Sequence, residues 1–298
     1  MSDIHALTLA DIAALDGDRV PCPACGPGQT VAHKRNKKVL RIWRVEPGFA
    51  TFCCARCGLK GYSRDGTSRA SRRSVAERLA SRAMRAQRKQ EESADRTRRI
   101  GIAERILGGG GPAAGGPVQH YLEGRFIRPP ILDIIRFSPA VWHPFERRNM
   151  PAMVARIDHP ITAAFTGVHV TFLQPDGSGK AVVKPDKITR GVAAGGVVRL
   201  VEPGAALALA EGVESALSFM QLSGIPTWSA LCAGNFCNVK LPTSVRDVVI
   251  AADNDERGLA EARKAGRRWR LEGRRVRIVR PTIAGQDWND VLKGGANG

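Results

Sequence analysis

The sequence lacks the long apolar run of a membrane-spanning helix: none of its 298 residues lies in a segment approaching about 18 consecutive apolar residues. It also lacks a basic stretch at its start. The first residues, M-S-D-I-H-A-L-T-L-A-D-I, carry acids early, so we expect no secretory signal. A chain of this length that is 43% hydrophobic has a globular composition, with room for about two domains. We therefore expect a cytoplasmic protein that is not inserted in a membrane.

Acidic residues are scarce relative to basic ones, with 28 Asp and Glu against 46 Lys and Arg and a formal net charge of +18. This balance indicates a polyanionic partner, with nucleic acid the first candidate and an anionic membrane surface the second. The alternative is that abundant arginine reflects coding bias in a GC-rich genome. Clustering weakens that alternative, because residues 64–99 hold twelve basic and five acidic residues.

Large apolar residues are nearly absent from this same basic stretch. Such a composition is typical either of a solvated basic helix or of a disordered tether. The following run G-G-G-G-P-A-A-G-G-P, at 108–117, predicts a flexible break. We interpret residues 63–117 as a basic, Gly-rich linker.

Cysteine is present in an odd number, seven, which does not suit a disulfide framework. Five of the seven fall within residues 22–57, where Cys22-x2-Cys25 and Cys54-x2-Cys57 form two matching knuckles, each followed by glycine. An alternating hairpin, 39–45 and 49–52, lies between them. Four thiolates in a tetrahedral array suit structural Zn²⁺, so residues 1–62 are predicted to form a zinc ribbon.

Several alternatives at this site stay open. Neighbouring strand residues point to opposite faces, so only one of Cys53 and Cys54 is expected to reach the metal, and Cys54 keeps the spacing. His33 is a substitute ligand to consider, although a histidine among Lys and Arg is usually solvated. The alternative to a zinc site is a set of unrelated buried cysteines. Cys232 and Cys237 are interpreted as core or loop residues.

The last hundred residues alternate strands with helices. Strands are predicted at 206–210, 226–231, 245–252 and 275–279, and helices at 214–222 and 256–271. This alternation indicates a parallel sheet with crossover helices. Residues 118–200 predict a mixed α+β region, with a short helix over 118–127 and short strands at 168–173 and 197–201.

Acidic residues follow three of the predicted parallel strands. Glu211 follows L-A-L-A, Asp253 and Asp255 follow V-V-I-A-A, and Asp287 with Asp290 come after 275–279. Because the carboxyl ends of parallel strands meet at one edge, these acids are expected to converge. Carboxylates alone suit Mg²⁺ or Mn²⁺. The alternative for D-x-D is that Asp255 caps the helix beginning at Glu256.

The order E-G-V-E-S-A-L-S (211–218), A-A-D-N-D-E-R-G (251–258) and Q-D-W-N-D-V-L (286–292) resembles the Toprim domain of bacterial-type primases, type IA and type II topoisomerases and some nucleases. The resemblance covers about residues 201–293. It implies that Glu211, Asp253 and Asp255 form a catalytic, metal-binding centre. Asp287 and, less closely, Asp290 match its third acidic segment.

A zinc ribbon followed by an α+β region and a Toprim domain resembles the primases of bacteria, phages and plasmids. The segment G-V-H-V-T-F-L-Q-P-D-G-S-G-K-A-V-V-K-P (167–185) is similar to the stretch before Toprim in primases of mobile elements, with Lys180 as the matching lysine. Lys184, Lys187 and Arg190 are further candidates for nucleotide or template contacts. The alternative for each is a solvated charged hairpin.

This chain departs from the family pattern in two places. Many primases carry an acid four residues after the first Glu, where this chain has Ser215, with Glu214 one position earlier. Many use a Cys/His/Cys/Cys zinc set, where this chain has four cysteines. The first departure puts a metal contact from that helix in doubt.

The resemblance implies a DNA primase that makes short RNA primers on single-stranded DNA from nucleoside triphosphates, beside a separate replicative helicase at the replication fork, and a phage or plasmid origin. A Toprim nuclease and a non-catalytic zinc-ribbon nucleic-acid-binding or helicase-partner protein are the rivals. A topoisomerase needs a tyrosine nucleophile, and only Tyr62 and Tyr121 are present. The fold class is then a mixed α/β and α+β multidomain chain: ribbon 1–62, linker 63–117, α+β half of the primase core 118–200, and a Rossmann-like Toprim domain 201–298.

Overall fold

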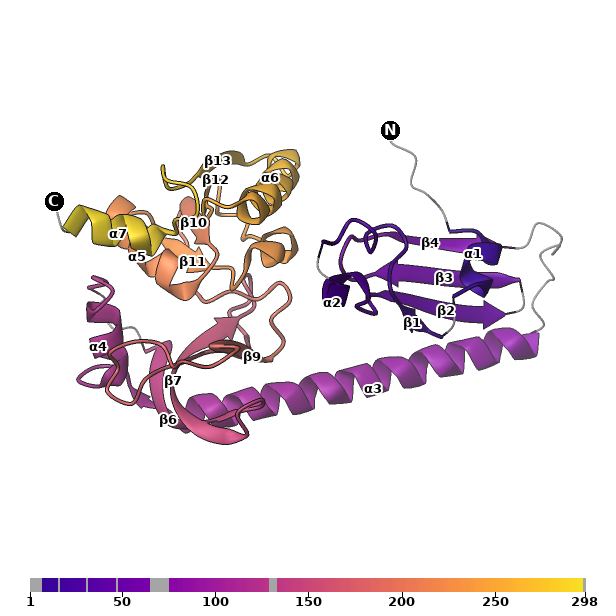
Figure 1. Cartoon of the computed structure of the whole chain (residues 1–298), viewed down its shortest axis with the longest axis horizontal. Helices are drawn as coiled ribbons and strands as arrows, with labels where there is room; N and C mark the ends of the chain where they lie inside the picture. The colour runs from indigo at the N-terminus through magenta and orange to yellow at the C-terminus, as the bar shows by residue number, and fades with distance from the viewer. Residues whose placement is uncertain are drawn as a thin grey trace. The chain divides into compact units, whose positions relative to one another are not determined.

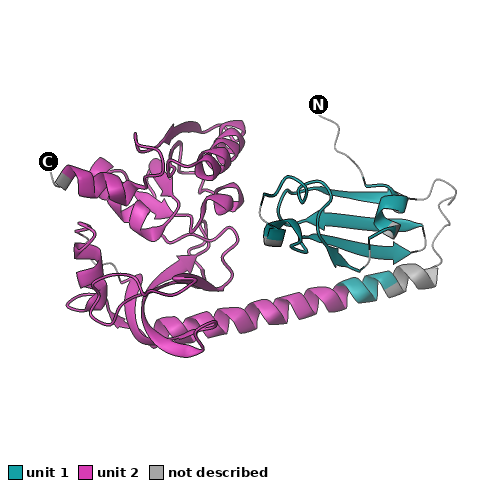
Figure 2. Cartoon of the chain, viewed as in Figure 1, with its two compact units in different colours: residues 1–85 teal, residues 86–298 magenta. Residues whose placement is uncertain are grey.

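The computed structural model describes residues 7–15, 17–30, 32–46, 48–64, 75–128 and 133–296. The chain has two compact units, Met1–Arg85 and Ala86–Gly298 (Figure 2). The helix α3 (Val75–Gly108) contains the boundary between them. Across the described ranges, no helix combines the length and the apolar character that crossing a membrane requires.

The first unit is built on an antiparallel sheet with the strand order β1-β2-β3-β4 (Figure 1). Its elements are α1 (Leu9–Ala13), β1 (Arg19–Val20), α2 (Ala32–Arg35), β2 (Leu40–Glu46), β3 (Phe49–Cys54) and β4 (Lys60–Arg64). The predicted hairpin is therefore confirmed as β2 and β3. Buried and less buried residues alternate along β3, which directs every second side chain into a small apolar core.

The basic stretch for which the sequence left a helix or a tether open is a helix where the structure describes it, since α3 runs over Val75–Gly108. Residues 65–74 lie outside the described residues. Its exposed side chains form pairs one turn apart, such as Arg88–Glu92 at 3.2 Å and Arg99–Asp95 at 3.1 Å. Such pairs support a solvated helix. Ala103, Ile106 and Leu107, near its end, pack against a sheet.

An antiparallel sheet of five strands, in the order β5-β6-β7-β8-β9, forms the first part of the second unit. Its elements are β5 (Gly111–Pro112), α4 (Pro117–Glu123), β6 (Ile135–His143), β7 (Arg148–Asp158), β8 (Phe165–Phe172) and β9 (Lys187–Gly191). The run 108–117, predicted to be a flexible break, instead contributes β5, which pairs with β6 at the sheet edge. The strand predicted at 197–201 is reduced to isolated bridges at Val197 and Val198.

The second part of this unit is a parallel sheet in the order β11-β10-β12-β13. Its elements are β10 (Ala206–Ala210), α5 (Val213–Ser223), β11 (Thr227–Ser229), the 3-10 helix η1 (Ala233–Asn238), β12 (Asp247–Ala251), α6 (Glu256–Leu271), β13 (Arg275–Val279) and α7 (Trp288–Ala296). The predicted parallel sheet with crossovers is confirmed. Helix α7 was not predicted from the sequence.

Both faces of the parallel sheet are covered, and residue size along β10 differs between them. Leu207 and Leu209 join the core formed with α6 and η1. Ala208 and Ala210 face α5, and their core also includes residues of α4, α7 and β7. Small residues on that face let α5 pack close to the strands. The five-stranded sheet and the parallel sheet therefore share one apolar core inside the second unit.

Gly177 fixes the approach of α4 to the loop between β8 and β9. Its φ is +75°, and a Cβ there would overlap backbone atoms of Pro117, the first residue of α4. We predict that Gly177→Ala lowers the free energy of unfolding by about 2 kcal/mol or more, because both the backbone conformation and the contact become strained. Urea denaturation followed by tryptophan fluorescence measures this loss.

The matched control is Gly179→Ala, because a Cβ at Gly179 would meet only the flexible end of Gln174, at 3.3 Å. Equal stability of the two variants would contradict the close approach of Gly177 to α4.

Candidate functional site

The four cysteines of the two knuckles form one cluster. Their sulfur atoms all lie within 4.8 Å of one another, with Cys22 Sγ 3.9 Å from Cys57 Sγ and Cys25 Sγ 3.8 Å from Cys54 Sγ. All four are free thiols. Four sulfur donors gathered in this way fit tetrahedral Zn²⁺, so the cluster is compatible with a zinc ribbon.

Electrostatic differences among the thiols follow from their surroundings. Burial, with its sulfur neighbours, raises the pKa of Cys25 to about 12. Burial also acts to raise the pKa of Cys54, but backbone N–H groups of Cys57 and Arg56 outweigh it and bring that pKa to about 7. Thiolate formation at Cys54 is thus favoured by the knuckle itself, and a bound cation would favour it at all four sulfurs.

The two knuckle glycines have different roles, although the sequence shows the same pattern at each. Gly58 has a φ of +72°, which favours glycine. Gly26 does not have a positive φ. It is needed because a Cβ there would lie 2.6 Å from the carbonyl oxygen of Cys22.

Cys53 lies on β3 opposite Arg41 of β2 and Lys60 of β4, next to the buried Cys54. Strand alternation therefore directs Cys53 to the other face of the sheet, away from the cluster. Cys53 is not part of the four-cysteine group. The side chain of His33 lies outside the described residues.

The acids of the parallel sheet follow its strands at one edge. Glu211 comes directly after β10, Asp253 and Asp255 follow β12, and Asp287 follows β13 at the start of α7. Since all the strands are parallel, these positions lie at the same edge, as expected. We call Glu211, Asp253, Asp255 and Asp287 the acidic edge.

Asp253 is the most perturbed member of the acidic edge. Burial raises the pKa of Asp253 to about 7, and the charges of Glu211, Asp287 and Asp255 act in the same direction. Its Oδ1 atom is buried and has no hydrogen-bond partner among the described residues. Burial also raises the pKa of Glu211, reinforced by Asp255. A buried, unpartnered carboxylate oxygen beside other acids fits a hard divalent cation, because such an ion favours the charged forms.

Asp255 and Asp287 also cap helices. Asp255 Oδ1 accepts a hydrogen bond from the Gly258 N–H of α6 at 2.6 Å, so the capping alternative is correct for this residue. Asp287 Oδ1 accepts from the N–H groups of Asn289 and Asp290 at 2.8 and 2.9 Å. Asp290 in turn accepts from the Asp287 N–H at 3.1 Å, which completes a capping box. Asp290 and Asp287 are thus joined by two hydrogen bonds within the first turn of α7.

The acidic edge is looser than the cysteine cluster. Among the histidine, cysteine, aspartate and glutamate side chains that the structure describes, the four cysteines are the only group of three or more close enough to share one metal ion. The acids interact through their charges, as the raised pKa of Asp253 indicates.

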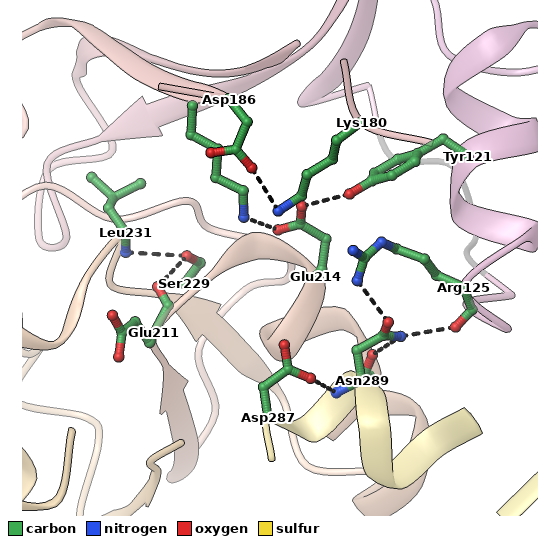
Figure 3. Close-up of polar contacts among 12 residues, drawn as sticks. Tyr121, Arg125, Lys180, Asp186, Glu211, Glu214, Ser229, Leu231, Asp287 and Asn289 are labelled. Carbon is green, nitrogen blue, oxygen red and sulfur yellow. Dashed lines mark hydrogen bonds and ion pairs between the residues drawn. The ribbon is translucent and has the colours of Figure 1, made fainter. Parts of the chain in front are cut away.

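Two of the four predicted basic residues, Lys187 and Lys180, form ion pairs with acids. Lys187 Nζ donates to Glu214 Oε2 at 2.8 Å, and Lys180 Nζ pairs with Asp186 at 2.9 Å (Figure 3). Lys184 is exposed. Arg190 lies opposite Val168 on β8, whereas Lys187 lies opposite Thr171, so these two side chains point to opposite faces. The structure brings Lys187 toward the acidic edge and directs Arg190 away from it.

Sequence reasoning missed several residues that organise this region. Asn289 is fully buried; it accepts from Arg125 Nη1 at 2.7 Å and donates to the Arg125 carbonyl at 2.8 Å and to Ser218 Oγ at 3.1 Å. Tyr121 donates to Glu214 (Figure 3). These partners are far apart in sequence, so no local pattern reveals them.

Comparisons with known proteins agree with the parallel-sheet assignment. Residues 206–297 match the sequence profile of the Toprim domain, and residues 97–200 match a domain of unknown function (DUF7146). No curated protein matches the sequence.

Solved structures similar to this chain include three primase fragments. The zinc-binding and RNA polymerase domains of the Aquifex aeolicus primase are 13% identical, with 89% of this chain and 77% of that one covered and a TM-score of 0.48. The primase fragment of the bacteriophage T7 primase-helicase is 13% identical over 93% and 94%, with a TM-score of 0.41. The DnaG primase catalytic domain bound to single-stranded DNA is 16% identical over 67% and 78%, with a TM-score of 0.46. The resemblance to Toprim is confirmed by the profile match, and residues 206–297 form a Toprim domain.

The cysteine geometry predicts which thiols hold zinc. We expect Cys54→Ser to reduce bound zinc well below the value of about one ion per chain for the unchanged protein, because a tetrahedral site then loses one of its four thiolates. Atomic absorption on the purified protein measures the zinc content. Cys53→Ser is the matched control and should keep its zinc; loss in that variant would contradict the assignment.

The raised pKa of Asp253 predicts the pH dependence of stability without added magnesium or manganese. Between its ordinary value of 3.8 and about 7, Asp253 is protonated in the folded chain and ionised in the unfolded chain. The folded state binds more protons, so this contribution to stability is present at low pH and is lost as pH rises to about 7. Asp253→Asn should therefore raise the Tm by about 2–6 °C at pH 8. Thermal unfolding at pH 5 should show a smaller gain, and equal gains at both values would contradict the shift.

Proposed function

We propose that the protein is a DNA primase that synthesises short RNA primers on single-stranded DNA by metal-dependent nucleotidyl transfer. The carrying observation is that a Toprim domain presents Glu211, Asp253 and Asp287 at one sheet edge, with Lys187 of the preceding sheet near them. Burial raises the pKa of both Glu211 and Asp253, and the charge of Lys187 acts in the opposite direction on each. Acids that hold a cation, beside a lysine that contacts phosphate, are the groups that nucleotidyl transfer requires.

Each acid has a place in this proposal. Glu211, Asp253 and Asp287 would hold Mg²⁺ or Mn²⁺, with Asp255 contributing while it caps α6. A divalent cation held there would offset the charge of the incoming nucleotide's phosphates and make the primer 3′-hydroxyl a better nucleophile. Asp253 suits the central position because its buried Oδ1 atom has no hydrogen-bond partner among the described residues.

Basic side chains of the five-stranded sheet would bind the anionic substrates. Lys187 is the residue at the acidic edge, and Lys180, paired with Asp186, lies in the same cluster around Glu214. Lys184 is exposed before β9, where a template phosphate can reach it. Arg190 lies on the opposite face of β9 and would contact template only outside the acidic edge.

The remaining parts of the chain receive supporting roles. The zinc ribbon (1–62) would select the start site on the template, and the basic linker (63–117), with α3, would connect it to the primase core formed by 118–200 and 201–298. The net charge of +18 favours a nucleic-acid backbone and predicts salt-sensitive binding. We further propose that the protein acts in the cytoplasm at a replication fork with a separate helicase, and that a phage or plasmid encodes it.

Primer synthesis provides the test. The protein is incubated with single-stranded DNA, labelled nucleotides and Mg²⁺ or Mn²⁺, and short labelled products are resolved on a gel. Asp253→Ala should reduce them at least about 100-fold, the scale seen when one key electrostatic group of a catalytic site is removed.

The matched control is Asp290→Asn, which keeps an oxygen able to accept the Asp287 N–H and should keep most of the activity. Template degradation instead of primer synthesis would replace this proposal with a Toprim nuclease. Tight template binding without either reaction would replace it with a non-catalytic module.

A further inference from the structure

A buried carboxylate joins the two sheets of the second unit. Glu214, on α5, is 3% exposed and accepts from Tyr121 of α4 at 2.9 Å (Figure 3). It also accepts from Lys187 of β9 at 2.8 Å. One oxygen faces each partner: Oε1 the phenol and Oε2 the ammonium. Three elements distant in sequence therefore meet at this side chain.

Burial of Glu214 acts to raise its pKa, but the charge and the hydrogen bond of Lys187 outweigh burial and hold the pKa below its ordinary value. The carboxylate is thus ionised and paired. A buried ion pair of this kind is weak support for stability, because apolar side chains of similar volume commonly serve as well. Because stability alone is weak grounds for such a pair, we consider a second role for it.

The position of the lysine suggests that role. A Cβ on Gly212, the residue directly after Glu211, would lie 3.9 Å from Lys187 Nζ and 3.7 Å from Glu214 Oε2. The ammonium is therefore beside the turn that carries the first acid of the edge. Burial raises the pKa of Glu211 and of Asp253, and the charge of this ammonium acts against that rise. Lys187 thus contacts Glu214 directly and also acts through its charge on two acids of the edge.

The second lysine of this cluster is held in the same manner. Lys180 pairs with Asp186 at 2.9 Å. His169 of β8 is almost wholly buried, and burial together with the charges of Lys187 and Lys180 lowers its pKa to about 4. A neutral histidine adds no positive charge to this cluster.

We propose that Glu214 and Tyr121 are positioning residues that hold the Lys187 ammonium off the acidic edge, which keeps Glu211 and Asp253 available to a divalent cation. Without Glu214, the partly buried ammonium has two remaining sources of counter-charge: Asp186, which already pairs with Lys180, and the edge acids. At the edge, the ammonium occupies the position of the cation. Glu214 and Tyr121 thus prevent the Lys187 ammonium from competing with the metal for the edge carboxylates. The inference rests on the metal site of the proposed function, but not on which reaction that site performs.

Metal affinity tests the proposal without any reaction. Mn²⁺ binding to the zinc-loaded full chain is measured by electron paramagnetic resonance, with neither nucleotide nor DNA present. Glu214→Gln should raise the Kd for Mn²⁺ about tenfold, equivalent to ~1.4 kcal/mol. The double variant Glu214→Gln with Lys187→Met should return the Kd to within about twofold of the unchanged protein, because the competing ammonium is gone. Recovery by removing a second residue is not expected of a merely structural pair.

Two further variants keep the result decisive. Tyr121→Phe removes one hydrogen bond while preserving shape, and should raise the Kd about two- to threefold even if Glu214→Gln folds poorly. Asp158→Asn is the matched control: Asp158 is 5% exposed and pairs with Arg156 at 2.7 Å, and no residue of the acidic edge contributes to its pKa shift. It should lower the Tm and leave the Kd unchanged.

An unchanged Kd in both Glu214→Gln and Tyr121→Phe would overturn the proposal, as would a raised Kd that Lys187→Met does not reverse. If the unchanged protein binds Mn²⁺ with the expected variant effects but makes no primers, the proposed function fails and this inference stands. If the unchanged protein binds no Mn²⁺, both fail.

Discussion

Repulsion among carboxylates at the ends of parallel strands is the constraint on which the second unit depends. Burial and the neighbouring acids raise the pKa of Asp253 to about 7, so this carboxyl keeps its proton below about that pH when no cation is bound. Asp255 and Asp287 meet the repulsion at helix N-termini, where backbone N–H groups and the helix dipole favour negative charge. Lys187 adds a nearby positive charge that is held by Glu214. The surrounding fold thus compensates one unfavourable cluster in three different ways.

The apolar core and this polar cluster are parts of one arrangement. Alternating alanine and leucine along β10 bring α5 close to the sheet on one side and leave room for α6 and η1 on the other. The close packing of α5 places Glu214 within reach of Tyr121 and Lys187, and α7 reaches the same region through buried Asn289. Polar groups buried this deeply need hydrogen-bond or charge partners, because an unpaired buried charge is costly.

Sequence reasoning succeeded where the controlling interactions are local. The bounds of β10, α6 and β13 agree with the predicted ones, because periodicity and caps define them within a few residues. The knuckle cysteines were found from spacing alone. The segment β5 was missed because glycine and proline indicate a break, although an edge strand tolerates proline. Helix α7 was missed because Gly294 and Gly295 weaken its helical pattern. The Lys187–Glu214 pair and the Arg125–Asn289 contacts join distant segments, so only the folded topology reveals them.

The double use of Asp255 and Asp287 has a consequence for how the acidic edge responds to a ligand. A side chain that closes a helix N-terminus has lost its rotamer freedom during folding, before any ligand arrives. Binding then requires little further ordering of these two carboxylates, which favours affinity through preorganisation. The same arrangement makes the edge difficult to remodel, since moving either carboxylate frays the first turn of α6 or α7. Cation affinity and the stability of the first turns of α6 and α7 therefore depend on the same two side chains, Asp255 and Asp287.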